Sequence, residues 1–309
     1  MRRPSLVYRC VRIASGQPIY MRELELGSAK NHCMATPDNI NLSELFRRAI
    51  FPKLAILGAG LVFVASLSGC GKPAEQAASA PSSGRSAAES ISQADELYAQ
   101  RADVMKVRQG LIALRQATAE YATNYELAWR VAKLNYYLGS HTTDETEQEK
   151  AFHDGIEAGK LAVKLNSDRP EGHFWLGANY GGNAEISTLA GLAEIEDIKR
   201  EMEAVLKIDE SFQSGSAYMA LGQVYLKAPR ILGGDVSKAI DYLEKGLKFG
   251  PNNALLRLRL AEAYAEAKRI PDAHRELKAL FESQPSPGYE PEYNDAVKEG
   301  RELEAKLKS

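Results

Sequence analysis

The chain has 309 residues, of which 44% are hydrophobic and 26% are charged, and its formal net charge is −2. Residues 1–69 hold nine Lys or Arg and four Asp or Glu, which leaves 30 basic and 37 acidic residues, a net charge of −7, from position 70 onward. Nucleic-acid binding requires a basic surface against the phosphate backbone, so we expect no nucleic-acid partner.

Cysteine usage limits the chemistry further. The three cysteines are Cys10, Cys33 and Cys70, and none follows position 70. The later part of the chain can therefore form neither a disulfide nor a zinc site of clustered cysteines. We expect no metal and no cofactor.

The N-terminal part has the features of a secretion signal. Residues 1–45 show no sustained apolar period, and Met21 and Met34 are alternative start sites to Met1. Basic residues at positions 47, 48 and 53 then precede an apolar run over residues 54–67. This run is too short to cross a bilayer comfortably and fits the core of a signal peptide, with an uncleaved transmembrane helix as the alternative.

Leu67-Ser68-Gly69-Cys70 directly follows this run and resembles a bacterial lipobox. The resemblance implies that residues 1–69 are removed and that Cys70 carries a diacylglycerol and an acyl chain such as palmitate. Several acyl chains anchor a protein firmly to a membrane. Gly71 in place of Asp favours the outer membrane by the enterobacterial rule, so we expect a lipid-anchored protein of the bacterial envelope that faces the periplasm.

Residues 70–91 are rich in Ala, Ser, Pro and Gly. Such a composition buries too little apolar surface to fold, and it predicts a disordered, flexible tether between the lipid and the folded part.

The remainder is predicted to be helical. We expect a first unit with helices near 92–101 and 103–122, a second over 126–166 and a third over 172–208, in which Gly181-Gly182 breaks the first helix. Two further units fill residues 215–285, and an amphipathic helix at 290–308 covers the open end of the array.

A repeat with a fixed step organises this region. Ala239, Leu243, Gly246 and Pro251 are followed 34 residues later by Ala273, Leu277, Leu280 and Pro285. This pattern resembles the tetratricopeptide repeat, whose units are pairs of antiparallel helices that cross at small residues. The resemblance implies an all-α, tetratricopeptide-like solenoid of about four or five hairpins over residues 92–285, with residues 286–309 as a C-terminal capping helix.

The second and third units are longer than a regular repeat. The spacings from Val131 to Leu176 and from Leu176 to Leu221 are both 45 residues, which adds about eleven residues to each unit. We expect these residues to lengthen helices or loops.

A narrower resemblance rests on two segments that follow the lipobox in the sequence. They are residues 173–181 (HFWLGANYG) and the loop at 228–239, with its Ala228-Pro229 and Leu232-Gly233-Gly234-Asp235. They look like the T component of TRAP (tripartite ATP-independent periplasmic) transporters. The resemblance implies an envelope lipoprotein, often trimeric, that partners a periplasmic substrate-binding protein and carries an apolar cleft. Asp235 is expected to cap the helix that follows.

Fixed positions on the first helix of each tetratricopeptide unit line the concave face. Large apolar residues recur there in successive units, which favours a binding surface. The predicted partner or ligand groove comprises Trp129, Lys133, Tyr136, Phe174, Tyr180, Met219, Gln223 and Leu258. Lys133 could meet a carboxylate of a peptide or of a metabolite. The alternative is that the extra residues or the tail helix fill this groove and bury the row.

No motif indicates catalysis. Residues from 70 onward hold His141, His153, His173 and His274, without a metal-protease motif, a nucleophile elbow or a candidate nucleophilic cysteine. We therefore expect a protein that binds rather than an enzyme. Three roles remain open: an accessory component of solute uptake, a scaffold for outer-membrane or cell-wall assembly, or a carrier of an apolar ligand.

Overall fold

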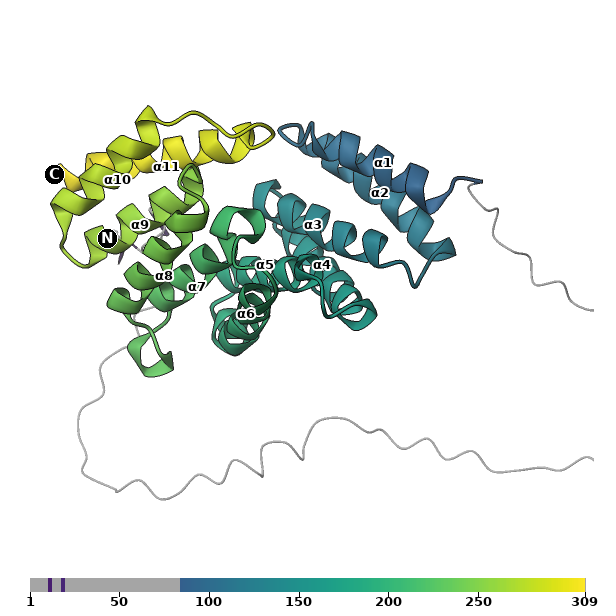
Figure 1. The fold of residues 1–309 in the computed structure, drawn as a ribbon, viewed down its shortest axis with the longest axis horizontal. Coiled ribbons are helices and arrows are strands. Elements are labelled where there is room, and N and C mark those ends of the chain that lie inside the picture. The colour runs from purple at the N-terminus through teal and green to yellow at the C-terminus, as the bar shows by residue number, and fades with distance from the viewer. Residues whose placement is uncertain (1–10, 13–17, 20–83, 309) are drawn as a thin grey trace, which may run out of the picture. The chain divides into compact units, whose positions relative to one another are not determined.

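The computed structural model describes residues 11–12, 18–19 and 84–308 (Figure 1). The chain divides into two compact units, Met1–Pro73 and Ala74–Ser309. In the first unit, β1 (Val11–Arg12) and β2 (Pro18–Ile19) form an antiparallel pair with Val11 opposite Ile19. The predicted signal peptide, the predicted lipidation site at Cys70 and the predicted tether up to residue 83 lie outside the described residues.

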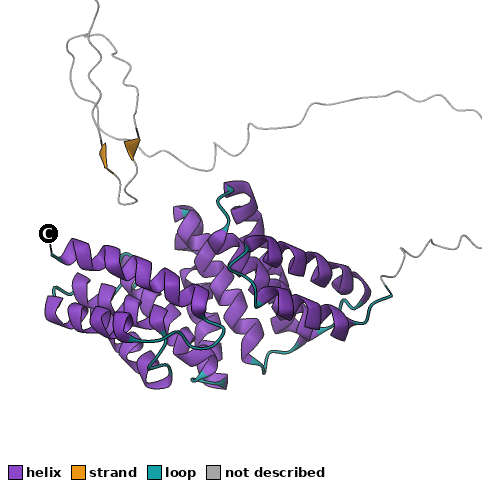
Figure 2. Cartoon of the chain, turned by 90° about the horizontal axis from the view of Figure 1, so that it is seen from above, coloured by secondary structure: helices purple, strands orange, loops and turns teal. Residues whose placement is uncertain are grey.

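Residues 84–308 are helical throughout, with short connections, and contain eleven α-helices and two 3₁₀ turns. The helices are α1 (Ala87–Tyr98), α2 (Val104–Glu120), α3 (Tyr125–His141), α4 (Glu145–Leu165), α5 (Pro170–Ile186), α6 (Thr188–Ile208), α7 (Ser216–Lys227), α8 (Val236–Phe249), α9 (Ala254–Glu266), α10 (Ile270–Glu282) and α11 (Glu290–Leu307), and the 3₁₀ turns are η2 (Phe212–Gly215) and η3 (Arg230–Leu232). Successive helices pack as five hairpins, α1/α2 to α9/α10, and α11 follows them (Figure 1). Figure 2 shows the same helical region turned by 90°. The predicted all-α hairpin array is confirmed.

The hairpins cross at small residues, as the repeat pattern predicts. Ala239, Ala261 and Ala273 are each fully buried. Gly222 lies so close to Leu243 that a Cβ on it would sit 2.6 Å from Leu243 Cγ. Close helix packing therefore explains why these positions hold small residues.

The extra residues of the second and third units lengthen their helices. The helices α3 to α6 have 17, 21, 17 and 21 residues. The helices α7 to α10 have only 12, 14, 13 and 13. The part of the array built from α3 to α6 therefore has longer helices than the part built from α7 to α10.

Helix α1 begins five residues before the predicted start near Ser92. Ser86 is its N-cap and accepts a hydrogen bond from the backbone N–H of Glu89, whose carboxylate in turn accepts from the backbone N–H of Ser86. This reciprocal capping box satisfies two backbone donors and fixes the helix start. The end of the predicted tether is therefore helical.

Gly181-Gly182 does not break α5, contrary to the sequence-based expectation. The helix continues to Ile186, and the ring of Phe152 on α4 packs directly against Gly182, where a Cβ would lie 2.1 Å from the ring. Gly182 thus makes room for a neighbouring side chain. The Cβ of an added side chain at Gly181 would meet no atom within 4 Å.

The last helix covers the end of the array. Leu277 and Leu280 of α10, Leu258 of α9 and Ala296 of α11 are buried together in one apolar cluster. This agrees with the need of a repeat array for a terminal cap. Between residues 84 and 308, no helix combines the length and the apolar character that crossing a membrane requires.

Candidate functional site

A cavity of about 1760 Å³ lies along the inner helices. Its walls come from the first helices of the hairpins, from α6 and from α11. The residues that line it include Tyr98, Arg101, Trp129, Lys133, Tyr136, Phe174, Trp175, Met219, Gln223, Arg259 and Glu292. The helices α3, α5 and α7 each present side chains to the same space because their inner positions recur with the repeat.

Six of the eight residues predicted to form the groove line this cavity: Trp129, Lys133, Tyr136, Phe174, Met219 and Gln223. Leu258 and Tyr180 do not. Leu258 is 0% exposed because its cluster with α10 and α11 encloses it, so the expectation that the tail helix could bury the row holds for this unit. In its place, Leu255 and Arg259 of α9 face the cavity.

Tyr180 is 8% exposed and packs in the apolar core between α5 and its neighbours. It follows Leu176 by four residues, and residues at this spacing lie on the same helix face. Leu176 is a buried core residue, so the helix geometry directs Tyr180 into the core as well.

The wall around Lys133 is aromatic. The ammonium nitrogen of Lys133 lies 3.8 Å from the ring centroid of Tyr98, 5.9 Å from that of Trp129 and 6.0 Å from that of Trp175. A cation over ring faces is stabilised electrostatically. Burial nevertheless lowers the pKa of Lys133 from 10.5 to about 8, despite the opposing effect of the Asp95 carboxylate.

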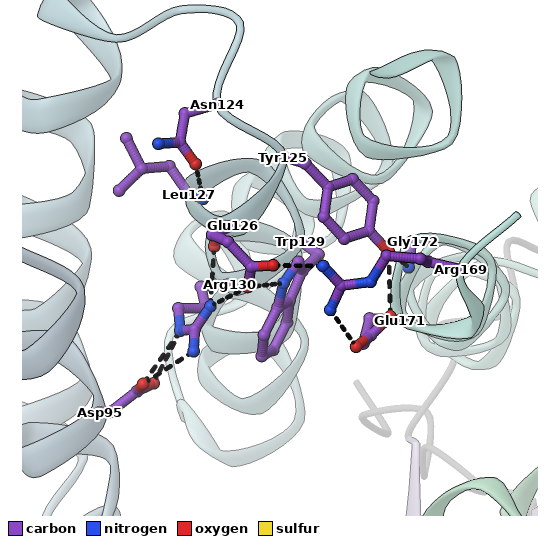
Figure 3. A network of polar contacts seen from close by, with 10 residues as sticks. All are labelled: Asp95, Asn124, Tyr125, Glu126, Leu127, Trp129, Arg130, Arg169, Glu171 and Gly172. Carbon is purple, nitrogen blue, oxygen red and sulfur yellow. Dashed lines mark hydrogen bonds and ion pairs between the residues drawn. The ribbon is translucent and has the colours of Figure 1, made fainter. Parts of the chain in front are cut away.

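A polar network holds one side of this wall (Figure 3). Glu126 accepts hydrogen bonds from the indole N–H of Trp129 at 2.8 Å and from Arg130 at 2.7 Å, and it also pairs with Arg169. Burial opposes ionisation here, yet the hydrogen bonds from Arg130 and Trp129 lower the pKa of Glu126. Arg130 in turn pairs with Asp95 of α1 at 3.0 Å. The network links the first three hairpins and fixes the orientation of the Trp129 indole.

Arg101 closes the cavity at one edge. Its guanidinium donates to both carboxylate oxygens of Glu292 on α11, at 2.8 and 2.6 Å, and to the backbone carbonyl of Gly288. It also stacks on Tyr98, 4.7 Å from the ring centroid. The side chain is only 5% exposed. Burial alone would lower the pKa of Arg101, but the hydrogen bonds with Glu292 raise it, so the guanidinium stays charged.

The start of α11 is held at two further points. His141 of α3 lies 3.4 Å from the carboxylate of Asp295, and the hydroxyl of Tyr289 donates to the Gln213 side chain at 2.8 Å. Gln213 and Ser214 both have positive φ angles, 49° and 54°, which are strained for residues other than glycine. The segment 285–292 thus connects the last hairpin to the first one across the cavity, and Figure 1 shows this segment beside the turn between α1 and α2.

The sequence pattern did not indicate several of these residues. Trp175 stands one position away from the expected concave row, and Arg101 and Glu292 are separated by 191 residues. The pairing of an Arg with a distant Glu leaves no local signal. Phe174, which the repeat positions did place in the groove, lines the cavity next to Trp175.

Two family models match the chain. The model described as "Regulator of microtubule dynamics protein 1-3" matches residues 90–225, and a tetratricopeptide-repeat model matches residues 230–298. Neither is a model of a TRAP transporter component. No curated protein sequence matches the chain.

The chain is also similar to several solved structures. TTC0263, a thermophilic TPR protein of Thermus thermophilus, is 18% identical, with a TM-score of 0.50 over 67% of this chain and 98% of its own. MamA from Desulfovibrio magneticus RS-1 is 13% identical, with a TM-score of 0.42 over 62% and 92%. PilF of Pseudomonas aeruginosa is 15% identical, with a TM-score of 0.45 over 69% and 89%. The family match over residues 230–298 and the hairpin array show that this chain has a tetratricopeptide-like helical fold.

Proposed function

We propose that this protein is a scaffold that holds a protein partner in the cavity along α3, α5 and α7, and that it acts by binding rather than by catalysis. The observation that carries the proposal is the cavity itself. It runs over the inner face of a tetratricopeptide array, a fold suited to protein–protein interaction, and six residues chosen from their repeat positions line it.

The apolar, aromatic and amide side chains of the cavity support this proposal. Met219 and Gln223 lie one turn apart on α7, where they offer a flexible apolar surface and an amide to a ligand. The aromatic rings of Trp129 and Phe174 supply large apolar contact areas of the kind that dominates protein interfaces. A partner segment would therefore find both apolar and polar contacts along three consecutive repeats.

The test is co-purification from the membranes of cells that express the full chain. Met219→Lys or Gln223→Lys, each placed in the cavity, is expected to reduce the recovered partner at least tenfold. Ser237→Lys on the exposed face of α8 adds the same charge and is the matched control. Equal recovery from the wild type and all three variants, with equal helical circular dichroism, contradicts the proposal.

We further propose that the scaffold is tethered to the envelope through Cys70, with residues 71–86 as the spacer. The lipobox-like Leu67-Ser68-Gly69-Cys70 supports this. The test uses metabolic labelling with palmitate and cell fractionation. The wild type should carry label and sediment with membranes, whereas Cys70→Ser should carry none. Equal labelling of both proteins contradicts the anchor.

Within this frame, we propose that the partner is a periplasmic substrate-binding protein and that the chain is an accessory component of a solute-uptake system, by its resemblance to TRAP T components. Binding of a purified substrate-binding protein of that class, lost in Met219→Lys, supports this role. Recovery of outer-membrane or cell-wall assembly proteins instead would support the scaffold role in assembly. The trimer implied by the resemblance is tested by light scattering.

A further inference from the structure

We propose that Lys133 is a carboxylate-binding residue: its ammonium receives a carboxylate of an extended peptide segment of the partner, either the chain end or an Asp or Glu side chain. This inference rests on the proposed function, since it names the chemistry by which the cavity recognises a partner.

The first observation is that the ammonium of Lys133 forms no ion pair with any described residue, although the Asp95 carboxylate acts on it from a greater distance. Among residues 84–308, no carboxylate lies within ion-pair distance of its ammonium, and its neighbours are the ring faces of Tyr98, Trp129 and Trp175. A half-buried ammonium without a hydrogen-bonded carboxylate is unfavourable. A ligand carboxylate would remove this deficit.

The other cations of the cavity are already neutralised or hydrated. Arg101 pairs with Glu292, and Arg130 pairs with Asp95 and Glu126. Arg259 lies 2.9 Å from both Glu262 and Glu299. Lys298 of α11 also lines the cavity but is exposed to water. Among the described lining residues, Lys133 is thus the half-buried cation that an incoming anion would find unpaired.

A second feature concerns polar groups of the cavity that lack partners among the described residues. The indole N–H of Trp175 is buried and has no hydrogen-bond partner among the described residues. The side-chain amide of Gln223, which also lines the cavity, makes no hydrogen bond within residues 84–308. The amide can donate to a peptide carbonyl and accept from a peptide N–H.

The positions of these groups favour an extended peptide over a small acid. Lys133 lies on α3 and Gln223 on α7, with α5 between them. Two helix spacings of roughly 8–10 Å each separate them, a distance that an extended chain covers with about five or six residues at roughly 3.4 Å per residue. The cavity of about 1760 Å³ also exceeds the roughly 300–1,000 Å³ of a small-molecule pocket.

The experiment uses the two tryptophans of the chain, Trp129 and Trp175, as probes, because both line the cavity beside Lys133. Four pools of acetylated hexapeptides without aromatic residues are titrated against the full chain and followed by tryptophan fluorescence. The first pool ends in a free carboxylate and the second in an amide. The third pool ends in an amide and contains one internal Asp. The fourth pool is the same as the third, with Lys in place of that Asp.

We expect the first or the third pool to bind at least tenfold more tightly than the second and the fourth. The pool that binds identifies the carboxylate as the chain end or the side chain. In Lys133→Met this preference should disappear, and in the control Lys298→Met it should remain. Circular dichroism confirms that both variants are folded.

The inference is overturned if Lys133→Met binds the acidic pools as tightly as the wild type, if the amide pool binds equally well, or if decanoate binds and no peptide pool does. Its failure is distinguishable from that of the proposed function. If no pool binds while Met219→Lys still abolishes partner recovery, only the role of Lys133 is refuted. If Met219→Lys leaves recovery intact, the cavity itself is refuted as the docking site.

Discussion

Replacing Lys133 by Met is expected to make the protein more stable at neutral pH while it removes the cation of the cavity. The pKa of Lys133 falls from 10.5 to about 8 in the folded protein, mainly because of burial. Each unit of pKa corresponds to about 1.36 kcal/mol, so the charged side chain costs the folded state about 3 kcal/mol. Loss of the ring contacts offsets about 1 kcal/mol of the gain. We expect Lys133→Met to raise the free energy of unfolding by about 2 kcal/mol at pH 7.

The pH dependence gives the prediction its sign. Between pH 8 and 10.5 the unfolded chain holds a proton on Lys133 that the folded protein has released, so the stability of the wild type rises with pH relative to the variant. The penalty is fully present below the folded pKa of about 8 and disappears as the pH approaches 10.5. The advantage of Lys133→Met should therefore be large at pH 7 and small at pH 10.

Urea unfolding at both pH values, followed by circular dichroism at 222 nm, measures this advantage. Lys298→Met is the control because its side chain is exposed, and its stability should stay within about 0.5 kcal/mol of the wild type. A Lys133→Met variant that is less stable than the wild type at pH 7, or whose advantage is the same at pH 7 and pH 10, contradicts a destabilising charge on Lys133.

Three further perturbations have defined outcomes. Arg101→Met removes one partner of a buried ion pair, so we expect a loss of about 3 kcal/mol and faster hydrogen exchange at the start of α11. Gly182→Ala forces a Cβ against the Phe152 ring and should cost about 2 kcal/mol in thermal or urea unfolding, whereas Gly181→Ala, which meets no neighbour, should stabilise α5 by up to about 1 kcal/mol. His173→Gln should destabilise the protein more at pH 6 than at pH 9, because the hydrogen bond with Glu201 raises the pKa of His173 above 6.5 and its stabilisation is lost as the pH rises through the raised pKa.

Each of these has an internal comparison. Arg115→Met breaks an exposed pair with Asp154 and should change stability by less than about 1 kcal/mol; an equal effect at Arg115 and Arg101 would contradict the importance of burial. Equal effects of Ala at positions 181 and 182 would contradict the packing of Phe152. A pH-independent effect of His173→Gln would show that folding does not raise the pKa of His173, which contradicts the role given to the hydrogen bond with Glu201.

The sequence predicts the array well because the repeat is a local signal. A step of 34 residues with small residues and a closing proline, as at Ala239 and Pro251, encodes a helix pair, and the inner positions of α3, α5 and α7 follow from it. The prediction was wrong for Leu258, where α11 packs on the same surface that is open in earlier repeats. The residue spacing within one repeat does not indicate whether a helix from a distant part of the chain packs on that repeat.

Tyr180 and Gly182 show a second kind of limit. Both lie in a segment rich in aromatic and small residues, and this composition is compatible with a loop, a binding groove or a close contact between helices. In the structure Gly182 lies inside α5 and packs against the Phe152 ring on α4. Where a residue's role depends on the shape of its neighbour, its own identity does not determine it.

The contact of Arg101 with Glu292 changes how the array responds to disturbance. In a linear stack each terminal unit borders a single neighbour, so its two extremities fray independently. Here the first hairpin and the last helix are each other's neighbour, and disorder that starts at one extremity removes support from the other. Loosening at α1 and at α11 should thus occur as a single event.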